Sequence, residues 1–145
     1  MEEVPESKVS FTCTFNILSV PKVKEFMIYM KELLNVYGRR ISFDTPYLRY
    51  PPHQCIQILP NEYEQYLIEA ENYMIKSNFN QLSVEKIKRL RAYMVNKTYN
   101  EEEIKQYRKD FVTFVDEHDR RRGTKFLDTF TEFKDFYNQI KYGTS

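Results

Sequence analysis

The sequence predicts an α/β fold in which a βαβ unit with parallel strands is followed by a C-terminal helical region. Three observations predict it. Residues 9–17 alternate apolar and polar side chains with the two-residue period of a strand. Residues 20–37 carry apolar side chains three and four positions apart, as a helix does, and a short apolar run follows within 40–44. A strand, a helix and a strand in this order predict parallel strands with a right-handed crossover.

The composition is typical of a single-domain globular protein. The chain has 145 residues, a formal net charge of +1 and 16% aromatic residues, a content that argues against disorder. The balanced charge argues against a nucleic-acid partner, and no apolar run reaches the roughly 18 residues of a membrane span. The start, Met-Glu-Glu, lacks the basic residues of a signal peptide, so we expect a cytoplasmic protein. Residues 1–8 are expected to be a flexible lead-in to one α/β domain over 9–145.

Capping and proline signals predict the remaining boundaries. Ser19 is placed to cap the first helix, and Gly38 to end it. Prolines keep the stretch 44–60 out of a helix, and residues 55–59 within it are a candidate third strand. A helical part is expected beyond residue 60. Its helices are predicted over 60–77, from a cap at Ser83, from the capping pair Asn100 and Glu103 to the arginines before Gly123, and over 131–142.

Polar side chains follow both predicted strands. In parallel sheets, ligands bind beyond the carboxyl ends of the strands. Those ends carry Asn16 and Ser19 after the first strand, and Asp44, Tyr47 and Arg49 after the second. Their amide, hydroxyl, carboxylate, phenol and guanidinium groups suit a polar ligand, so these five residues are the candidate site. The alternative is structural, because Ser19 can cap a helix and Asp44 can cap a turn.

Other clusters have a chemical and a structural interpretation. His53 and Cys55 could share a metal ion, but zinc needs three or four ligands, so packing is favoured and no metal site is predicted. His118, within the acid–base cluster 117–119, could serve hydrolytic or transferase chemistry, and a polar helix end is favoured instead. The arginines at 120–122 are typical of a phosphate-binding patch, and compensation of the helix dipole is favoured there. No catalytic residue is identified.

Three segments carry a resemblance to a known family. FNILSVPKVKEFM, RRISFDTPYLRYPPHQCIQILP and the distant DEHDRRRGTKFLDTFTEFKDFY resemble the C-terminal half of radical S-adenosylmethionine (radical SAM) proteins of the SPASM or twitch-type group, often carried by phages and bacteria. The resemblance implies a partial barrel with 9–17 and 40–44 as late strands. It also implies that Asn16 and Ser19 approach the cofactor or substrate. Asp44, Tyr47 and Arg49 would line the mouth of the barrel.

The cluster ligands of that family are absent from this chain. Family members hold a [4Fe–4S] cluster on a Cys-x3-Cys-x2-Cys loop, and the cluster cleaves S-adenosylmethionine to a radical that abstracts hydrogen from a substrate. This chain has two cysteines, Cys13 and Cys55, too few for such a cluster. We therefore expect no cofactor on this chain alone, and a role as the late strands and substrate-side wall of an enzyme completed by an N-terminal half. The alternative is a stand-alone, non-enzymatic interaction module that pairs through an exposed sheet edge, for example as a homo-oligomer.

Overall fold

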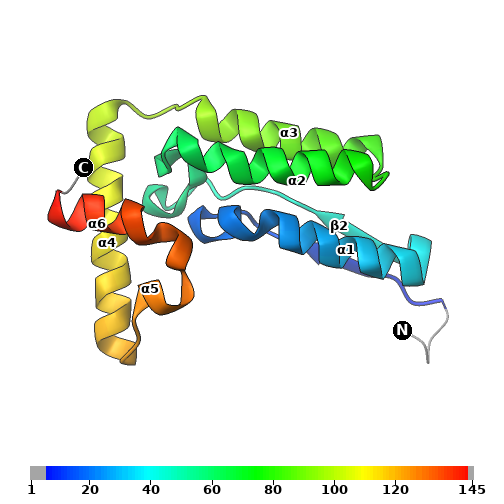
Figure 1. Ribbon diagram of the computed structural model, residues 1–145, viewed down its shortest axis with the longest axis horizontal. Helices are drawn as coiled ribbons and strands as arrows, with labels where there is room; N and C mark the ends of the chain where they lie inside the picture. Colours follow the sequence, from blue (N-terminus) through cyan, green and yellow to red (C-terminus); the bar gives the residue numbers. More distant parts are fainter. Residues whose placement is uncertain (1–5, 144–145) are drawn as a thin grey trace.

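The computed structural model describes residues 6–143, which are mostly helical (Figure 1). The described strands are β1 (Val9–Thr12) and β2 (Ile41–Asp44). The helices are α1 (Val23–Tyr37), α2 (Glu64–Lys76), α3 (Gln81–Val95), α4 (Glu101–Arg122), α5 (Phe126–Thr129) and α6 (Lys134–Tyr142). Short 3-10 turns join them: η1 (Ile17–Lys22), η2 (Gly38–Arg40), η3 (Pro52–Gln54), η4 (Ile56–Ile58), η5 (Asn61–Tyr63) and η6 (Thr131–Phe133). The predicted α/β, barrel-like fold class is therefore wrong.

The two strands pair in parallel, with Val9 beside Ile41 and Thr12 beside Asp44, and α1 lies between them in sequence. An isolated parallel bridge joins Phe15 to Tyr47 farther along. The expected strand, helix and strand are thus present, but β1 covers only the first part of residues 9–17. Among the described residues the sheet has these two strands and no more.

The candidate third strand at 55–59 is instead a pair of tight turns. The Ile58 N–H donates to the Cys55 carbonyl and the Leu59 N–H donates to the Ile56 carbonyl, the three-residue spacing of 3-10 structure. Ile56 and Ile58 are fully buried, because η4 packs against α3 and α4. A short apolar run can be buried as a strand or as helical turns, and the spacing of its apolar residues does not distinguish the two. Residues 55–59 are therefore packed against helices and are not part of the sheet.

Two predicted helix caps lie at the wrong residue. Asn16, three residues before Ser19, caps η1, and α1 follows from Val23. Asn80 caps α3, because its Oδ1 accepts a hydrogen bond from the Ser83 N–H at 2.8 Å. In both cases the predicted cap is the N3 residue of the turn that the asparagine begins.

The boundaries of α4 agree with the prediction. Asn100 and Glu103 form a reciprocal capping box, with the Glu103 N–H 2.9 Å from Asn100 Oδ1 and the Asn100 N–H 3.1 Å from Glu103 Oε2. Gly123 ends the helix with φ of +66°, a left-handed conformation that glycine adopts without strain. This helix carries one wall of the candidate site.

The helices form two groups that share one core. The strands, α1, α2 and α3 run roughly side by side, and α4 crosses the end of this group together with α5 and α6 (Figure 1). Phe15 from near the start of the chain is almost fully buried in the same apolar cluster as Phe111 and Phe133 from its last quarter. No described helix is long and apolar enough to cross a membrane. Of the predicted lead-in, residues 1–5 lie outside the described residues.

Candidate functional site

Asn16 and Ser19 lie where β1 continues into η1. Asn16 Oδ1 accepts a hydrogen bond from the Leu18 N–H at 2.8 Å, and Ser19 Oγ accepts one from the Asn16 N–H at 3.3 Å. The Ser19 hydroxyl also donates to Asn16 Oδ1 at 3.4 Å. This capping box shows that both predicted site residues have a structural role.

Asp44 ends β2 and is turned toward α3. Its Oδ1 accepts hydrogen bonds from Lys86 Nζ at 2.8 Å and from the Thr45 N–H at 2.9 Å. The Lys86 hydrogen bond, followed by the Thr45 amide, lowers the pKa of the Asp44 carboxyl from its ordinary value. The carboxylate therefore links the end of β2 to a helix and caps the turn that follows.

Tyr47 and Arg49 belong to an aromatic stack on α3. The Tyr47 ring stacks on that of Tyr93 with centroids 4.1 Å apart. Arg49 Nη2 donates to the Tyr47 hydroxyl at 3.2 Å, and its guanidinium lies 5.3 Å from the centre of the same ring. The five predicted residues thus divide among three local arrangements. Of the five, Asn16 is the one that lines the cavity described next.

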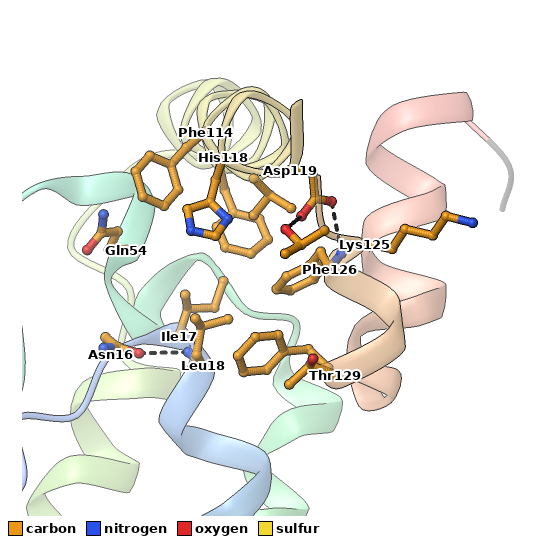
Figure 2. A pocket seen from close by; sticks show the side chains of 14 residues that line it. Asn16, Ile17, Leu18, Gln54, Phe114, His118, Asp119, Lys125, Phe126 and Thr129 are labelled. Atoms are coloured by element: carbon orange, nitrogen blue, oxygen red, sulfur yellow. Dashed lines mark hydrogen bonds between the residues drawn. The ribbon is translucent and has the colours of Figure 1, made fainter. Parts of the chain in front are cut away.

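A cavity of about 470 Å³ lies beyond the end of β1, between η1, α4 and α5 (Figure 2). We call it the α4–α5 cavity. Most of its wall is apolar, and the side chains come from segments far apart in sequence. The apolar lining residues are Ile17 and Leu18 of η1, Phe111, Phe114 and Val115 of α4, Phe126 of α5, and Phe130 just after α5. The polar lining residues are Asn16, Gln54, His118, Asp119, Thr124, Lys125 and Thr129.

Asp119 holds the turn between α4 and α5 at the rim of this cavity. Its Oδ1 accepts a hydrogen bond from Thr124 Oγ1 and its Oδ2 accepts one from the Phe126 N–H, both at 2.8 Å (Figure 2). Neither carboxylate oxygen bonds to His118, and among the described residues no hydrogen bond reaches that imidazole. The cluster 117–119 is therefore not an assembled acid–base pair.

The α4 wall is the part of the site that the sequence analysis missed. Phe111 is buried, whereas Phe114 is 47% exposed at the rim. A usable signal was present, because Phe111, Val115 and His118 recur at spacings of four and three and so share one face of a helix. Figure 2 shows the His118 ring directed from α4 toward the cavity.

His53 packs against Phe114. Its ring is 5.4 Å from the Phe114 ring, and its buried Nε2 has no hydrogen-bond partner in the structure. A second hollow of about 530 Å³ is lined there by His53, Phe114 and His118 together with Asp110, Thr113, Glu117, Arg121 and Arg122. In the described part of the chain no group of three or more His, Cys, Asp or Glu side chains is placed to hold a metal ion.

The arginine run 120–122, for which dipole compensation was favoured over phosphate binding, is partly an internal ion-pair cluster. Glu117 accepts hydrogen bonds from Arg120 Nε at 2.9 Å and Nη2 at 2.6 Å, and from Arg121 Nε at 2.7 Å. Two of the three guanidinium groups are therefore engaged by a carboxylate one turn earlier on the same helix, which leaves little for a bound phosphate.

The outer edge of β1 is a second feature with functional potential. The Cys13 N–H donates to the Asp44 carbonyl and the Phe15 N–H to the Pro46 carbonyl. Hydrogen bonds in a parallel ladder recur at every second residue, so the backbone N–H and carbonyl groups of the odd-numbered residues in this segment point toward β2. The backbone groups of Ser10, Thr12 and Thr14 point away from β2, and these three residues are exposed. Within residues 6–143 no strand pairs with this edge.

The thiols do not fit the cluster that the radical SAM resemblance implies. Cys55 is fully buried, Cys13 is half-buried, and no further cysteine exists in the chain. Burial raises the pKa of both thiols, whereas iron binds thiolates. Comparison of the chain with protein-family models, with curated proteins and with solved structures finds no match.

Proposed function

We propose that this chain is a non-enzymatic interaction module that completes its sheet with a strand added at the outer edge of β1, and that a second copy of the chain can supply this strand. The observation that carries the proposal is the incomplete parallel sheet. Parallel sheets are normally covered on both faces, and two short strands are marginal alone. Here Ser10, Thr12, Ser42 and Asp44 are exposed on one face.

The two edges of the sheet differ in a way that favours β1 as the pairing edge. On β2, the Ile41 N–H donates to the Gly38 carbonyl and the Thr45 N–H to the Asp44 side chain, and Pro46 follows. These local bonds use the donors at both ends of that edge. On β1 the outward donors of Ser10, Thr12 and Thr14 have no backbone partner among the described residues. An added strand would satisfy them.

The β1 edge also lacks the features that keep edge strands apart. Natural edges carry lysine, proline or inward-facing charges that prevent association. The segment VSFTCTF over residues 9–15 has no charged residue, no proline and no glycine, and its β-branched and aromatic residues favour strands. Nothing in this segment repels an identical copy.

The proposal is tested by amide hydrogen exchange and light scattering over a range of protein concentrations. In the dilute chain we expect rapid exchange at Ser10, Thr12 and Thr14, and slow exchange at Phe11 and Cys13. At higher concentration the three outward amides should become protected while the mass rises from 17.7 kDa to twice that value. A chain that stays monomeric throughout would overturn the proposal, and so would protection of these amides in the dilute monomer.

Two lysine variants distinguish pairing at the edge from packing on the open face. Thr12→Lys places a charge on the edge strand, and Ser42→Lys places the same charge on the same exposed face of β2. Thr12→Lys should abolish the dimer, and Ser42→Lys should leave it intact. Equal loss in both variants would show that the face, rather than the edge, carries the contact.

The radical SAM hypothesis names a different occupant for the same edge. The open parallel strand favours it as well, because the next strand could come from the portion of such an enzyme that carries the cluster cysteines. On that hypothesis the chain alone should remain colourless after anaerobic treatment with iron and sulfide. A chain that acquires a stable brown cluster by itself would contradict the expectation drawn from its two cysteines.

A further inference from the structure

Contacts between residues of the protein itself hold the walls of the α4–α5 cavity in place. Asp119 fixes the α4–α5 turn through its bonds to Thr124 and the Phe126 N–H. Ile17 and Phe111 are almost fully buried, each about 1% exposed, so two residues of its wall belong to the core. Side chains held in this way give a preformed binding site, which lowers the entropic cost of binding.

Aromatic rings dominate the wall of this cavity. The Phe111 and Phe126 rings meet edge to face with centroids 5.8 Å apart, and Phe126 stacks on Phe130 at 4.9 Å. Phe114 is the fourth ring, on the rim. The ring surfaces that face the cavity favour contact with another aromatic ring. The volume of about 470 Å³ exceeds the roughly 150 Å³ of an apolar cavity that holds benzene, so a two-ring molecule can be accommodated.

The charged groups at the rim are not available to a charged ligand. Both Asp119 oxygens already accept hydrogen bonds. Figure 2 shows the Lys125 side chain extending away from the cavity. No other Asp, Glu, Lys or Arg lines this cavity. An ion placed here would lose hydration without gaining an opposite charge, so the cavity favours an uncharged ligand.

His118, an exposed residue of α4, is one of the polar residues that line this cavity. Its ring points toward the cavity, and no described residue forms a hydrogen bond with it. A neutral imidazole can either donate or accept a hydrogen bond. Ligand sites typically combine apolar walls with a few polar groups that orient the ligand. We propose that the α4–α5 cavity binds an uncharged, mainly aromatic small molecule of about two rings whose single polar group forms a hydrogen bond with His118.

The proposal does not depend on the β1 edge and is tested with three related probes on the full chain. These are 2-naphthol, naphthalene, which lacks the hydroxyl, and 2-naphthoate, which carries a negative charge. We expect 2-naphthol to bind most tightly and to shift the His118 Hε1 resonance in NMR spectra. In His118→Phe the preference for 2-naphthol over naphthalene should fall by roughly 2- to 10-fold, the value of one hydrogen bond. Naphthalene should still bind this variant.

Two tryptophan variants locate the binding. Thr129 and Asp128 are adjacent and exposed on α5, but only Thr129 lines the cavity. Thr129→Trp should abolish binding of 2-naphthol by filling the cavity, and Asp128→Trp should leave it unchanged. The proposal is overturned if Thr129→Trp binds like the parent chain, if 2-naphthoate binds more tightly than 2-naphthol, or if His118 shows no shift at the solubility limit of 2-naphthol.

Discussion

The side-chain carbonyl of Gln57 accepts two hydrogen bonds from Thr98, one from Oγ1 at 2.7 Å and one from the backbone N–H at 3.2 Å. On the other side, the Gln57 Nε2 donates to the backbone carbonyls of Tyr93 and Asn96 at 2.7 and 3.2 Å. One fully buried amide thus binds the C-terminal end of α3 and the segment leading to α4. It fixes the start of the α3–α4 connection to η4, which itself packs against both α3 and α4.

Replacing Gln57 with leucine should destabilise the fold strongly. Leucine keeps the volume but removes four hydrogen bonds, those to the carbonyls of Tyr93 and Asn96 and to the N–H and hydroxyl of Thr98, and each lost hydrogen bond costs about 0.5–1.5 kcal/mol. We expect the free energy of unfolding to fall by about 3 kcal/mol, measured by urea denaturation. Gln54→Leu is the matched control, because the Gln54 side chain has no hydrogen-bond partner among the described residues. Equal losses in both variants would contradict the role of this network.

The pH dependence of the unfolding free energy should reveal the lowered pKa of Lys97. Its ammonium is half-buried, donates to the Leu59 carbonyl at 2.8 Å and pairs with no described carboxylate. Burial, and next the charge of Arg108, lowers the pKa of Lys97 from 10.5 to about 8. Between these two values the unfolded chain binds more protons than the folded one, so stability rises as pH rises from about 8 to 10.5. Below pH 8 both states are protonated and the penalty is constant.

Lys97→Met removes this contribution and serves as the reference. The difference in unfolding free energy between the parent chain and the variant should rise by about 1–2 kcal/mol from pH 8 to pH 10. This is below the full value of about 1.36 kcal/mol per pKa unit because the side chain keeps part of its contact with water. Tyrosine ionisation affects both proteins and cancels in the difference. Parallel pH profiles for the two proteins would contradict the prediction.

The sequence predicted local structure better than the fold class. Three local features depend only on neighbouring residues, and all three are present in the structure: the capping box at Asn100, the helix end at Gly123 and the strand alternation near Phe11. The position of a helix cap is ambiguous in the sequence when the N-cap residue and the N3 residue are both polar, because either of them could be the cap. This is why Asn16 and Asn80 were missed in favour of residues three positions later.

The fold class and the site could not be predicted because both depend on distant contacts. The apolar run 55–59 is compatible with a strand, and only its burial against α3 and α4 determines the turns. Asn16, which the strand-end rule named, lies beside a cavity, but the opposite wall of that cavity comes from α4, about 100 residues later in the chain. Asp44 does not line this cavity and pairs with Lys86 instead, and Tyr47 stacks on Tyr93. Both partners lie on α3, more than 40 residues later, where no local sequence pattern reveals them.

Asp119 should control the rigidity of the α4–α5 turn. Asp119→Ala leaves the Phe126 N–H and the Thr124 hydroxyl without their acceptor, and loss of such a capping interaction costs about 1–2 kcal/mol. We expect that decrease in unfolding free energy, with faster hydrogen exchange at the Phe126 amide. Asp119→Asn keeps one acceptor oxygen, so its unfolding free energy should decrease less than that of Asp119→Ala. Asp128→Ala, at an exposed position of α5, should change stability by less than about 0.5 kcal/mol. Unchanged exchange at Phe126 in Asp119→Ala would contradict the prediction.

The two thiols should differ in their rate of alkylation. Burial raises the pKa of Cys13 and of Cys55, and the thiolate is the reactive form, so both should react more slowly than a free thiol. Cys13 is half-buried, whereas Cys55 is fully buried, so Cys55 should react only when the fold opens. The measurement is iodoacetamide labelling followed by mass spectrometry, with Cys13→Ser and Cys55→Ser variants so that each thiol is observed alone.

Coupling this assay to Gln57 shows whether labelling of Cys55 reports opening of the whole fold. If it does, Gln57→Leu in the Cys13→Ser background should accelerate Cys55 labelling on the order of 100-fold, because every 1.4 kcal/mol changes an equilibrium constant about tenfold. Cys13 labelling in the Cys55→Ser background should accelerate much less, since a half-buried thiol can react through local motion. If Cys55 reacts as fast as Cys13 in the parent chain, the burial of η4 beneath α3 and α4 is not maintained in solution.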